Sequence, residues 1–468
     1  MRLINAVTKK LIERIILRAM TGKLTDLEKV LALARRMGTT GLRDFLEALA
    51  RDSSAQSGFA QLFLRLGGSI SPLGKRKLVR NLVCNWGLEG PRIRGSLEKR
   101  GIHAPSHIVI SPSMRCNLRC TGCYSGLYSK DGELSEEEID RVLTEARGFG
   151  SYFIVVSGGE PYLMKDAWMR LWKKHSDMFF MTYTNGTLLD QQTVDELARL
   201  GNVAPAISVE GYREETDRRR GAGVFDTLSG SMDRLRKAGV IFGISVTYTR
   251  ENAEIVSSES FLRHYIDVGA IFGWYFMFMP VGKDPILELV PTPEQRLAFG
   301  RRIAAVREHL PIFLADFWND GPAVGGCLAG GRLYLHILNS GRVEPCVFAH
   351  FGVDNVREKS ILEAANSPFF QSIRKRFPYN QNGNLMRPCM IIDNPQVLRE
   401  TVAESMARQG HEGSEDIIRN PKVVEWVDRY AERYRALTDP EWERTIDDPK
   451  NKWHRKGKSY QSLFGPMR

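Results

Sequence analysis

The sequence predicts an α/β protein built on a partial (β/α)6 barrel of the TIM type, with a helical N-terminal extension and a small C-terminal module that carries cysteines. From about residue 102, short apolar stretches alternate with amphipathic helical stretches, which is the pattern of parallel βα units. Six apolar stretches are candidate strands: residues 107–114, 152–157, 179–184, 203–209, 240–248 and 271–279. Polar motifs follow several of these stretches, at the strand ends where such barrels place their chemistry.

The chain of 468 residues is too long for one ordinary domain, and its 43% hydrophobic content is ample for a core. We expect a helical extension over residues 1–101, the barrel over 102–312, the small cysteine module over 313–395 and a polar helical tail over 396–468. The seven cysteines show no disulfide pattern and indicate a reducing cytoplasm.

Helix signals support the alternation. Ser135 with Glu138 forms a capping box at the start of a helix between the first two strands. A second helix is expected to open at Asp226, and a third at Thr292, where a proline follows the cap residue.

The N-terminal extension leaves two interpretations open. Apolar residues between Leu11 and Leu17 are interleaved with lysines and arginines, which suits a basic amphipathic helix on the inner face of the membrane. A helix that packs on the barrel with its charges in water fits the same pattern. The net charge of +11 permits an acidic surface as partner, although no nucleic acid is expected. We find no secretory signal and no apolar run of membrane-spanning length.

Three cysteines, Cys116, Cys120 and Cys123, lie within eight residues just after the first strand. A closed zinc site needs four ligands, and no histidine or fourth cysteine lies nearby. An iron–sulfur cluster with one open iron suits three thiols better, because the open iron accepts a small-molecule ligand. A zinc loop and buried thiols remain as alternatives for this motif alone.

The C-x3-C-x2-C spacing resembles that of the radical S-adenosylmethionine (radical SAM) superfamily. The resemblance implies a [4Fe-4S] cluster on Cys116, Cys120 and Cys123 and SAM as the second cofactor. It also implies an oxidoreductase-type enzyme in which the cluster, reduced by a flavodoxin or ferredoxin, cleaves SAM to a 5′-deoxyadenosyl radical. That radical then removes a hydrogen atom from a substrate carbon.

Two strand-end motifs match SAM-binding positions of that superfamily. Gly158, Gly159 and Glu160 follow the second strand, where the glycines allow close backbone approach and the carboxylate can take the SAM amino group. Asn185 follows the third strand as a polar contact to SAM. Each motif by itself is also an ordinary turn.

The next two strands add three candidates. The resemblance makes Ser208 a contact to the ribose, Arg220 a fork onto the methionine carboxylate and Ser245 a further contact. A solvated cluster of arginines at 218–220 is the alternative for Arg220.

One position departs from the family pattern. Many members carry an aromatic residue just before the third cysteine, against the adenine, and this chain has Gly122 there. Tyr124 follows the cysteine instead and is the candidate substitute.

A second set of cysteines, Cys327, Cys346 and Cys389, surrounds an expected hairpin with a turn at 339–341. The set resembles the SPASM module or its shortened form, twitch, and implies one auxiliary [4Fe-4S] cluster. His350 and Asp393 are candidates for its fourth ligand, and a zinc site is the alternative.

A peptide or protein is the expected substrate, because auxiliary-cluster enzymes of this type most often modify peptides. A lipid or isoprenoid chain and a cofactor precursor are the alternatives. A non-catalytic iron–sulfur binding or sensing protein is the alternative from a different class.

Overall fold

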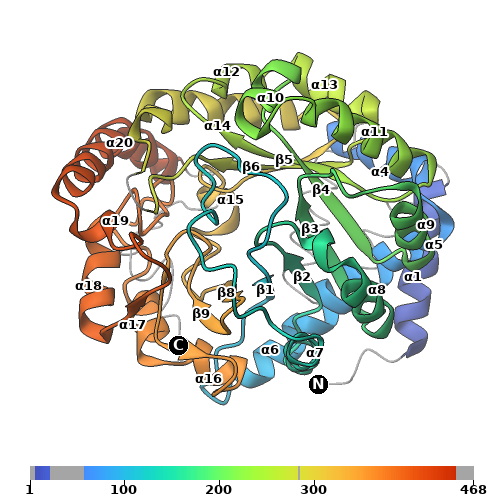
Figure 1. Cartoon of the computed structure of the whole chain (residues 1–468), viewed down its shortest axis with the longest axis horizontal. Coiled ribbons are helices and arrows are strands. Elements are labelled where there is room, and N and C mark those ends of the chain that lie inside the picture. The colour runs from blue at the N-terminus through green and yellow to red at the C-terminus, as the bar shows by residue number, and fades with distance from the viewer. Residues whose placement is uncertain (1–5, 22–56, 283–284, 449–468) are drawn as a thin grey trace.

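The computed structural model describes residues 6–21, 57–282 and 285–448. Its centre is a curved ten-stranded sheet in the order β11-β9-β8-β1-β2-β3-β4-β5-β6-β7 (Figure 1). Strands β1 to β7 and β8 run parallel, whereas β9 and β11 are antiparallel to their neighbours. The sheet does not close, so the expected partial barrel is confirmed. The strands are β1 His107–Ser111, β2 Phe153–Val156, β3 Phe179–Thr184, β4 Val203–Val209, β5 Gly243–Tyr248, β6 Phe272–Met277, β7 Phe313–Asp316, β8 Tyr334–Leu338, β9 Arg342–Glu344 and β11 Asp354–Asn355.

All six predicted strands are present, and the sheet extends beyond them on both sides. Strand β7 adds a seventh parallel strand next to β6, beyond residue 312. The predicted hairpin is β8–β9, and β8 pairs in parallel with β1. The second cysteine set is therefore carried by a continuation of the barrel sheet, which a strand pattern cannot reveal because it does not specify partners.

Helices cover the outer face of the sheet and connect its parallel strands. The capping boxes at Ser135 and Thr292 are both formed. The expected start at Asp226 was wrong, because α11 begins at Val224 after Gly223, which has a positive φ. The connecting helices are α7 Glu136–Gly148, η2 Pro161–Met164, α8 Lys165–Lys174, α9 Gln191–Leu200, α10 Arg213–Arg220, α11 Val224–Lys237, α12 Ala253–Val256, α13 Glu259–Val268, η3 Leu287–Leu289 and α14 Pro293–Arg307.

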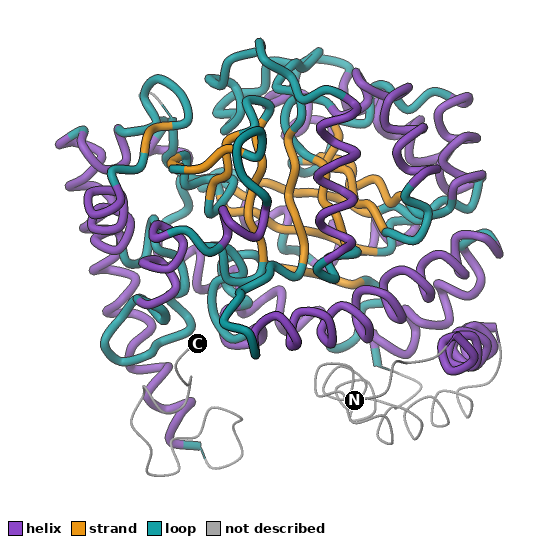
Figure 2. Tube along the Cα trace, turned by 90° about the horizontal axis from the view of Figure 1, so that it is seen from below, coloured by secondary structure: helices purple, strands orange, loops and turns teal. Residues whose placement is uncertain are grey.

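The N-terminal helices lie across the N-terminal ends of the strands, as Figure 2 shows along the lower edge of the sheet. They are α4 Gly58–Ser69, α5 Pro72–Lys77, the π-helix η1 Leu78–Glu89 and α6 Gly90–Glu98. Ile70 packs with Phe179 and Ala204 near the starts of β3 and β4. The Asn81 side-chain amide donates to the carbonyl of Met178 at 2.8 Å. This extension therefore forms a floor beneath the barrel.

Helix α1, Ala6–Thr21, packs against α4 and η1. Ile12, Ile16 and Met20 on this helix are buried, and Lys9 pairs with Glu89 of η1. This packing favours the interpretation of a helix bound to the rest of the protein over that of a helix on a membrane surface. Among the described residues, no helix combines the length and apolar character needed to span a membrane.

The chain after β7 forms the auxiliary module and a helical layer beside it. A buried ion pair ties them to the barrel: Arg296 Nη1 of α14 donates to Asp393 Oδ1 at 2.5 Å, and its guanidinium lies 3.9 Å from the centre of the Tyr434 ring. The elements are α15 Gly321–Val324, β10 Phe351–Gly352, α16 Ile361–Ala365, α17 Pro368–Lys375, α18 Pro395–Ser405, β12 Arg408–Gln409, α19 Asp416–Arg419 and α20 Pro421–Asp447. The remainder of the predicted tail, residues 449–468, lies outside the described residues.

Candidate active site

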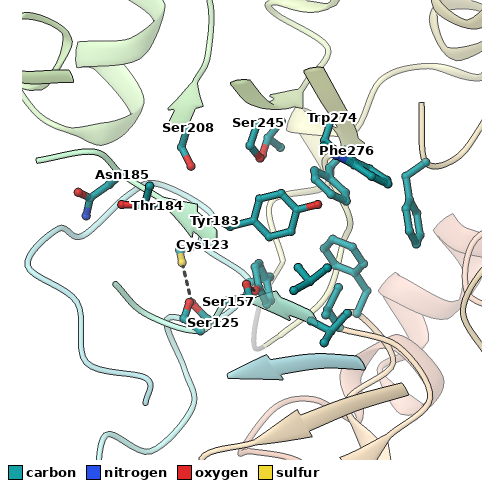
Figure 3. Close-up of a pocket in the computed structure, with 18 of the residues that line it drawn as sticks. Cys123, Ser125, Ser157, Tyr183, Thr184, Asn185, Ser208, Ser245, Trp274 and Phe276 are labelled. Carbon is teal, nitrogen blue, oxygen red and sulfur yellow. Dashed lines mark hydrogen bonds between the residues drawn. The ribbon is translucent and has the colours of Figure 1, made fainter. Parts of the chain in front are cut away.

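A cavity of about 200 Å³ opens at the C-terminal ends of the strands and runs into the barrel (Figure 3). Every SAM- and cluster-binding candidate that the sequence singled out in the barrel lines it. These residues are Cys116, Cys120, Cys123, Tyr124, Gly158, Gly159, Glu160, Asn185, Ser208, Arg220 and Ser245. Residues from five strand ends thus meet at one place, as parallel strands require.

The three thiols lie on the loop between β1 and α7 at the mouth of the cavity, and each sulfur has a hydrogen-bonding partner. The Leu118 N–H donates to Cys116 Sγ at 3.4 Å, and Ser125 Oγ lies 3.2 Å from Cys123 Sγ. Arg220 Nη1 donates to Cys120 Sγ at 3.9 Å. Burial raises the pKa of Cys120, and the Arg220 guanidinium opposes that rise. Donors and a cation around the sulfurs suit thiolates that bind a positively charged cluster.

The glycines after β2 line the cavity and also have a packing role that was not expected. A side chain on Gly159 would place its Cβ 1.9 Å from the Arg115 carbonyl oxygen, and one on Gly158 would lie 2.3 Å from that of Ser113. The Gly159 and Glu160 N–H groups donate to these two carbonyls. Both glycines therefore allow the turn after β2 to pack against the start of the cysteine loop, which positions the thiols.

Glu160 is almost completely buried, and its carboxylate holds neighbouring loops together. It accepts from the Tyr162 N–H at 3.1 Å, from Thr184 Oγ1 at 2.7 Å and from the Asn185 N–H at 2.8 Å. Burial raises its pKa, and these donors oppose the rise. A carboxylate has about four acceptor positions, so one remains for a cation in the cavity.

Asn185 lies directly beside the cysteine loop. Its Nδ2 donates to Asn117 Oδ1 at 2.9 Å and lies 3.9 Å from Cys116 Sγ. Ser208 and Ser245 are paired neighbours on β4 and β5, and both hydroxyls point into the cavity (Figure 3). Among the described residues, neither hydroxyl has a hydrogen-bond partner, so both are available to a ligand.

Arg220 lines the cavity as expected, and its guanidinium is held by a buried carboxylate. Its guanidinium donates through Nε and Nη2 to Glu210 Oε1, at 2.9 and 2.5 Å, and Arg219 Nη1 donates to the same oxygen at 2.6 Å. Two of the three Arg220 nitrogens are thus bonded to Glu210, which the sequence analysis did not include, and the contact to the methionine carboxylate stays a prediction. The alternative of a fully solvated cluster is wrong, because Arg219 and Arg220 are mostly buried.

The place beside Gly122 is occupied by an aromatic ring from another element. Gly122 has φ +64°, and a Cβ there would lie 2.4 Å from Cε2 of Phe278, just after β6. Tyr124 instead places its ring 5.4 Å from that of Phe348 and hydrogen-bonds through its hydroxyl to Ser157 Oγ at 2.8 Å. Phe278, rather than Tyr124, is the aromatic neighbour of the residue before the third cysteine.

The second cysteine set also converges. Cys327, Cys346 and Cys389 line one small cavity beside the barrel, together with Phe317 and Trp318. Burial raises the pKa of Cys327 to about 12. Among the residues that the structure describes, no three His, Cys, Asp or Glu side chains are arranged to hold a single metal ion, at either set.

Neither candidate for a fourth auxiliary ligand is free. Asp393 pairs with Arg296 and accepts from the Cys389 N–H at 3.0 Å. His350 bonds through Nε2 to the Val347 carbonyl oxygen at 2.9 Å and through Nδ1 to His411 Nε2 at 2.8 Å. Both side chains are committed to other partners.

The deep part of the cavity contains residues that the sequence analysis missed. Tyr183, Trp274 and Phe276 point inward from β3 and β6 (Figure 3), and Phe317, Tyr334 and Phe348 also line the cavity. Alternate residues of β6 are less buried than their neighbours. The strand is apolar almost throughout, so the sequence does not show this alternation, and only the sheet shows which side faces the interior.

Comparison with known families identifies the two cysteine-bearing regions. The Radical SAM superfamily model matches residues 110–258, and the SPASM iron–sulfur cluster-binding domain matches residues 327–390. The chain therefore contains a radical SAM domain followed by a SPASM domain. The first domain implies a [4Fe-4S] cluster and SAM, and the SPASM domain implies auxiliary iron–sulfur binding.

The relatives of this chain carry the names of different enzymes. The chain is 25% identical to an AdoMet-dependent heme synthase of Methanosarcina barkeri over 58% of this chain and 85% of the relative. It is 28% identical to the mycofactocin maturase MftC of Mycobacterium tuberculosis over 61% of this chain and 76% of the relative. The fold is similar to that of Streptococcus suis SuiB bound to precursor peptide SuiA, with a TM-score of 0.54 and 17% identity over 70% of this chain and 79% of SuiB.

Proposed function

We propose that this enzyme holds its SAM-cleaving cluster on Cys116, Cys120 and Cys123 and removes a hydrogen atom from a carbon of a peptide or protein. The observation that carries the proposal is the single cavity lined by these thiols and by the other strand-end candidates. When bound, the cluster supplies the electron that breaks the sulfonium of SAM. The chain's own residues bind and orient the reactants and keep water away.

Different residues of the cavity have different proposed roles. The remaining acceptor position of Glu160 suits the SAM ammonium group, and the unpartnered Ser208 and Ser245 hydroxyls suit its sugar. Arg220, held by Glu210, directs positive charge at Cys120 and thereby favours its thiolate.

The auxiliary site provides a second cluster position beside the substrate cavity. Cys327, Cys346 and Cys389 supply three thiolates, and Phe317 lines both cavities. A cluster held there would share the Phe317 wall with the substrate cavity and would supply or accept an electron at that side. A flavodoxin or ferredoxin is the proposed external reductant.

A peptide substrate is supported by MftC, named a maturase, and by SuiB, described with its precursor peptide. A heme precursor is the second candidate, supported by the heme synthases among the relatives. A lipid chain has less support, because the apolar face of α1 is packed inside the protein.

Formation of 5′-deoxyadenosine tests the initiating site. The anaerobically reconstituted enzyme, supplied with dithionite and SAM, should form it, and the Cys116→Ala, Cys120→Ala and Cys123→Ala variants should not. Cys84→Ala is the matched control, because Cys84 belongs to neither set. Persistent product in the loop variants would refute the assignment, and no product from the wild type would favour an iron–sulfur sensor.

Substrate class is tested separately by stimulation of SAM turnover. A peptide extract of the native cell should increase 5′-deoxyadenosine formation, and protease treatment of the extract should abolish the increase. Stimulation by iron-coproporphyrin or by phospholipid vesicles, with none by the peptides, would replace the proposal.

A further inference from the structure

The deep end of the barrel cavity is closed. His107 and Phe153 lie opposite one another in the register of β1 and β2, at the bottom of the barrel. Their ring centres are 5.9 Å apart, and Trp86 of the N-terminal floor lies 5.7 Å from Phe153. Trp86 is fixed by its Nε1, which donates to the Ser106 carbonyl at 2.8 Å. The cavity is therefore a blind pocket, and the group that enters it has a limited length.

The deep walls are largely aromatic, and their rings stand at different angles. The rings of Tyr183 and Phe276 meet edge to face at 84°, with centres 5.4 Å apart. Trp274 lies nearly parallel to Phe276, and Phe276 is tilted by 49° from Phe348. Such walls offer both ring faces and ring edges, which is the environment that favours another ring over a flexible chain.

No charged side chain lines the deep part of the cavity among the described residues. The charged members of the lining, Glu160, Arg219 and Arg220, all lie near the cysteine loop at the mouth. At the floor, burial lowers the pKa of His107 to about 3, so this ring is neutral near pH 7. An occupant with carboxylates would lose its hydration there without gaining a counter-charge.

Neutral hydrogen-bonding groups nevertheless point into this space. Figure 3 shows the Tyr183 hydroxyl in the middle of the cavity, with the Ser245 hydroxyl above it. Neither the Tyr183 hydroxyl nor Trp274 Nε1 has a hydrogen-bond partner among the described residues. Polar groups inside an apolar cavity usually find a partner, so these groups await an acceptor on the ligand.

We infer that the deep cavity binds an uncharged, ring-sized group of the substrate that bears a neutral hydroxyl or carbonyl oxygen, with Tyr183 and Trp274 as its hydrogen-bonding partners. This inference rests on the proposed function, since it names the part of the substrate that faces the cleaved SAM. The whole cavity, mouth included, has a volume of about 200 Å³, and a cavity of roughly 150 Å³ holds benzene, so the deep part has room for no more than about one ring. It does not suit a tetracarboxylate macrocycle or a long hydrocarbon chain.

Three small probes test the inference on the reconstituted enzyme with SAM bound, by ligand-observed NMR titration. Phenol has the ring and the neutral oxygen, benzoate has a ring with a charge, and hexan-1-ol has the oxygen on a flexible chain. We expect phenol to bind at least tenfold more tightly than either of the others. Benzoate or hexan-1-ol binding as tightly as phenol would overturn the inference, as would an absence of phenol binding.

Two conservative variants locate the phenol site. Tyr183→Phe and Trp274→Phe each keep a ring and remove one donor, so each should weaken phenol binding about fivefold, as expected for one hydrogen bond. Tyr212→Phe, on the exposed side of the barrel, should bind phenol as the wild type does. Equal affinity in all four proteins would place phenol elsewhere and contradict the inference. Formation of 5′-deoxyadenosine, measured on the same preparation, tests the proposed function independently of probe binding.

Discussion

The hydroxyl of Tyr334 donates to Cys346 Sγ at 3.5 Å, while the ring of the same tyrosine lines the barrel cavity. One side chain therefore contacts both the space proposed for the substrate and a thiol proposed for the auxiliary cluster. The contact arises because β8 pairs with β1, which places Tyr334 level with His107 inside the barrel. Phe317 also lines both cavities.

Removal of this hydroxyl should change the auxiliary cluster and leave the SAM-cleaving cluster as it is. Hydrogen bonds to cysteine sulfur stabilise the more negative reduced state of a cluster, so Tyr334→Phe should lower the auxiliary midpoint potential. A redox titration followed by electron paramagnetic resonance measures both clusters. Tyr183→Phe, which removes a cavity hydroxyl without contact to a cysteine, is the control. Unchanged potentials in Tyr334→Phe would contradict the prediction.

Gly122→Ala should destabilise the cysteine loop. The positive φ alone costs an L-residue about 1–2 kcal/mol, and the new methyl group also meets the Phe278 ring. We expect less iron per chain and a lower free energy of unfolding. Gly132→Ala separates the two causes, because Gly132 has φ +75° and open space around its Cα. Addition of Phe278→Ala to Gly122→Ala should partly restore the iron content and the free energy of unfolding. If neither is restored, the clash with the Phe278 ring is excluded as a cause.

Glu210→Gln should impair SAM binding and lower stability. The substitution removes the anion that Arg219 and Arg220 share at a mostly buried position, where an unpaired partner typically costs up to about 3–5 kcal/mol. Partial exposure of the arginines reduces this cost. Urea unfolding and a SAM binding titration provide the measurements. Asp226→Asn, which breaks the exposed pair with Arg213, should cost no more than about 1 kcal/mol.

Asp316, at the end of β7, should make stability depend on pH. Burial, together with the nearby Asp320, raises its pKa from 3.8 to about 6. The native state thus binds this proton more tightly than the unfolded state. The contribution of Asp316 to the free energy of unfolding is therefore full below about pH 4 and is lost as the pH rises through 6.

The free energy of unfolding of the wild type should therefore fall by about 1.4 kcal/mol between pH 5 and pH 7.5 because of this group. Asp316→Asn should remove that fall. Urea unfolding at several pH values measures the difference between the two proteins. Parallel profiles for the wild type and the variant would show that Asp316 does not titrate in this range.

The sequence by itself was sufficient to predict which residues meet at the cavity mouth. Cysteine spacing and the polar residues at strand ends are local features, and parallel strands bring their C-terminal ends to one edge whatever the details of packing. Period and capping signals likewise predicted all six strands, the capping box at Ser135 and the helix start at Thr292, because these depend on neighbours in the chain.

Only the tertiary structure decided what the site residues contact. Arg220 faces Glu210, Phe278 fills the place beside Gly122, and Tyr334 reaches Cys346 across two elements. These contacts depend on the pairing of strands that are distant in sequence and on which side of β6 faces the interior. Local periodicity specifies neither the strand pairing nor the inward-facing side, because an apolar stretch requires a partner surface without determining which one.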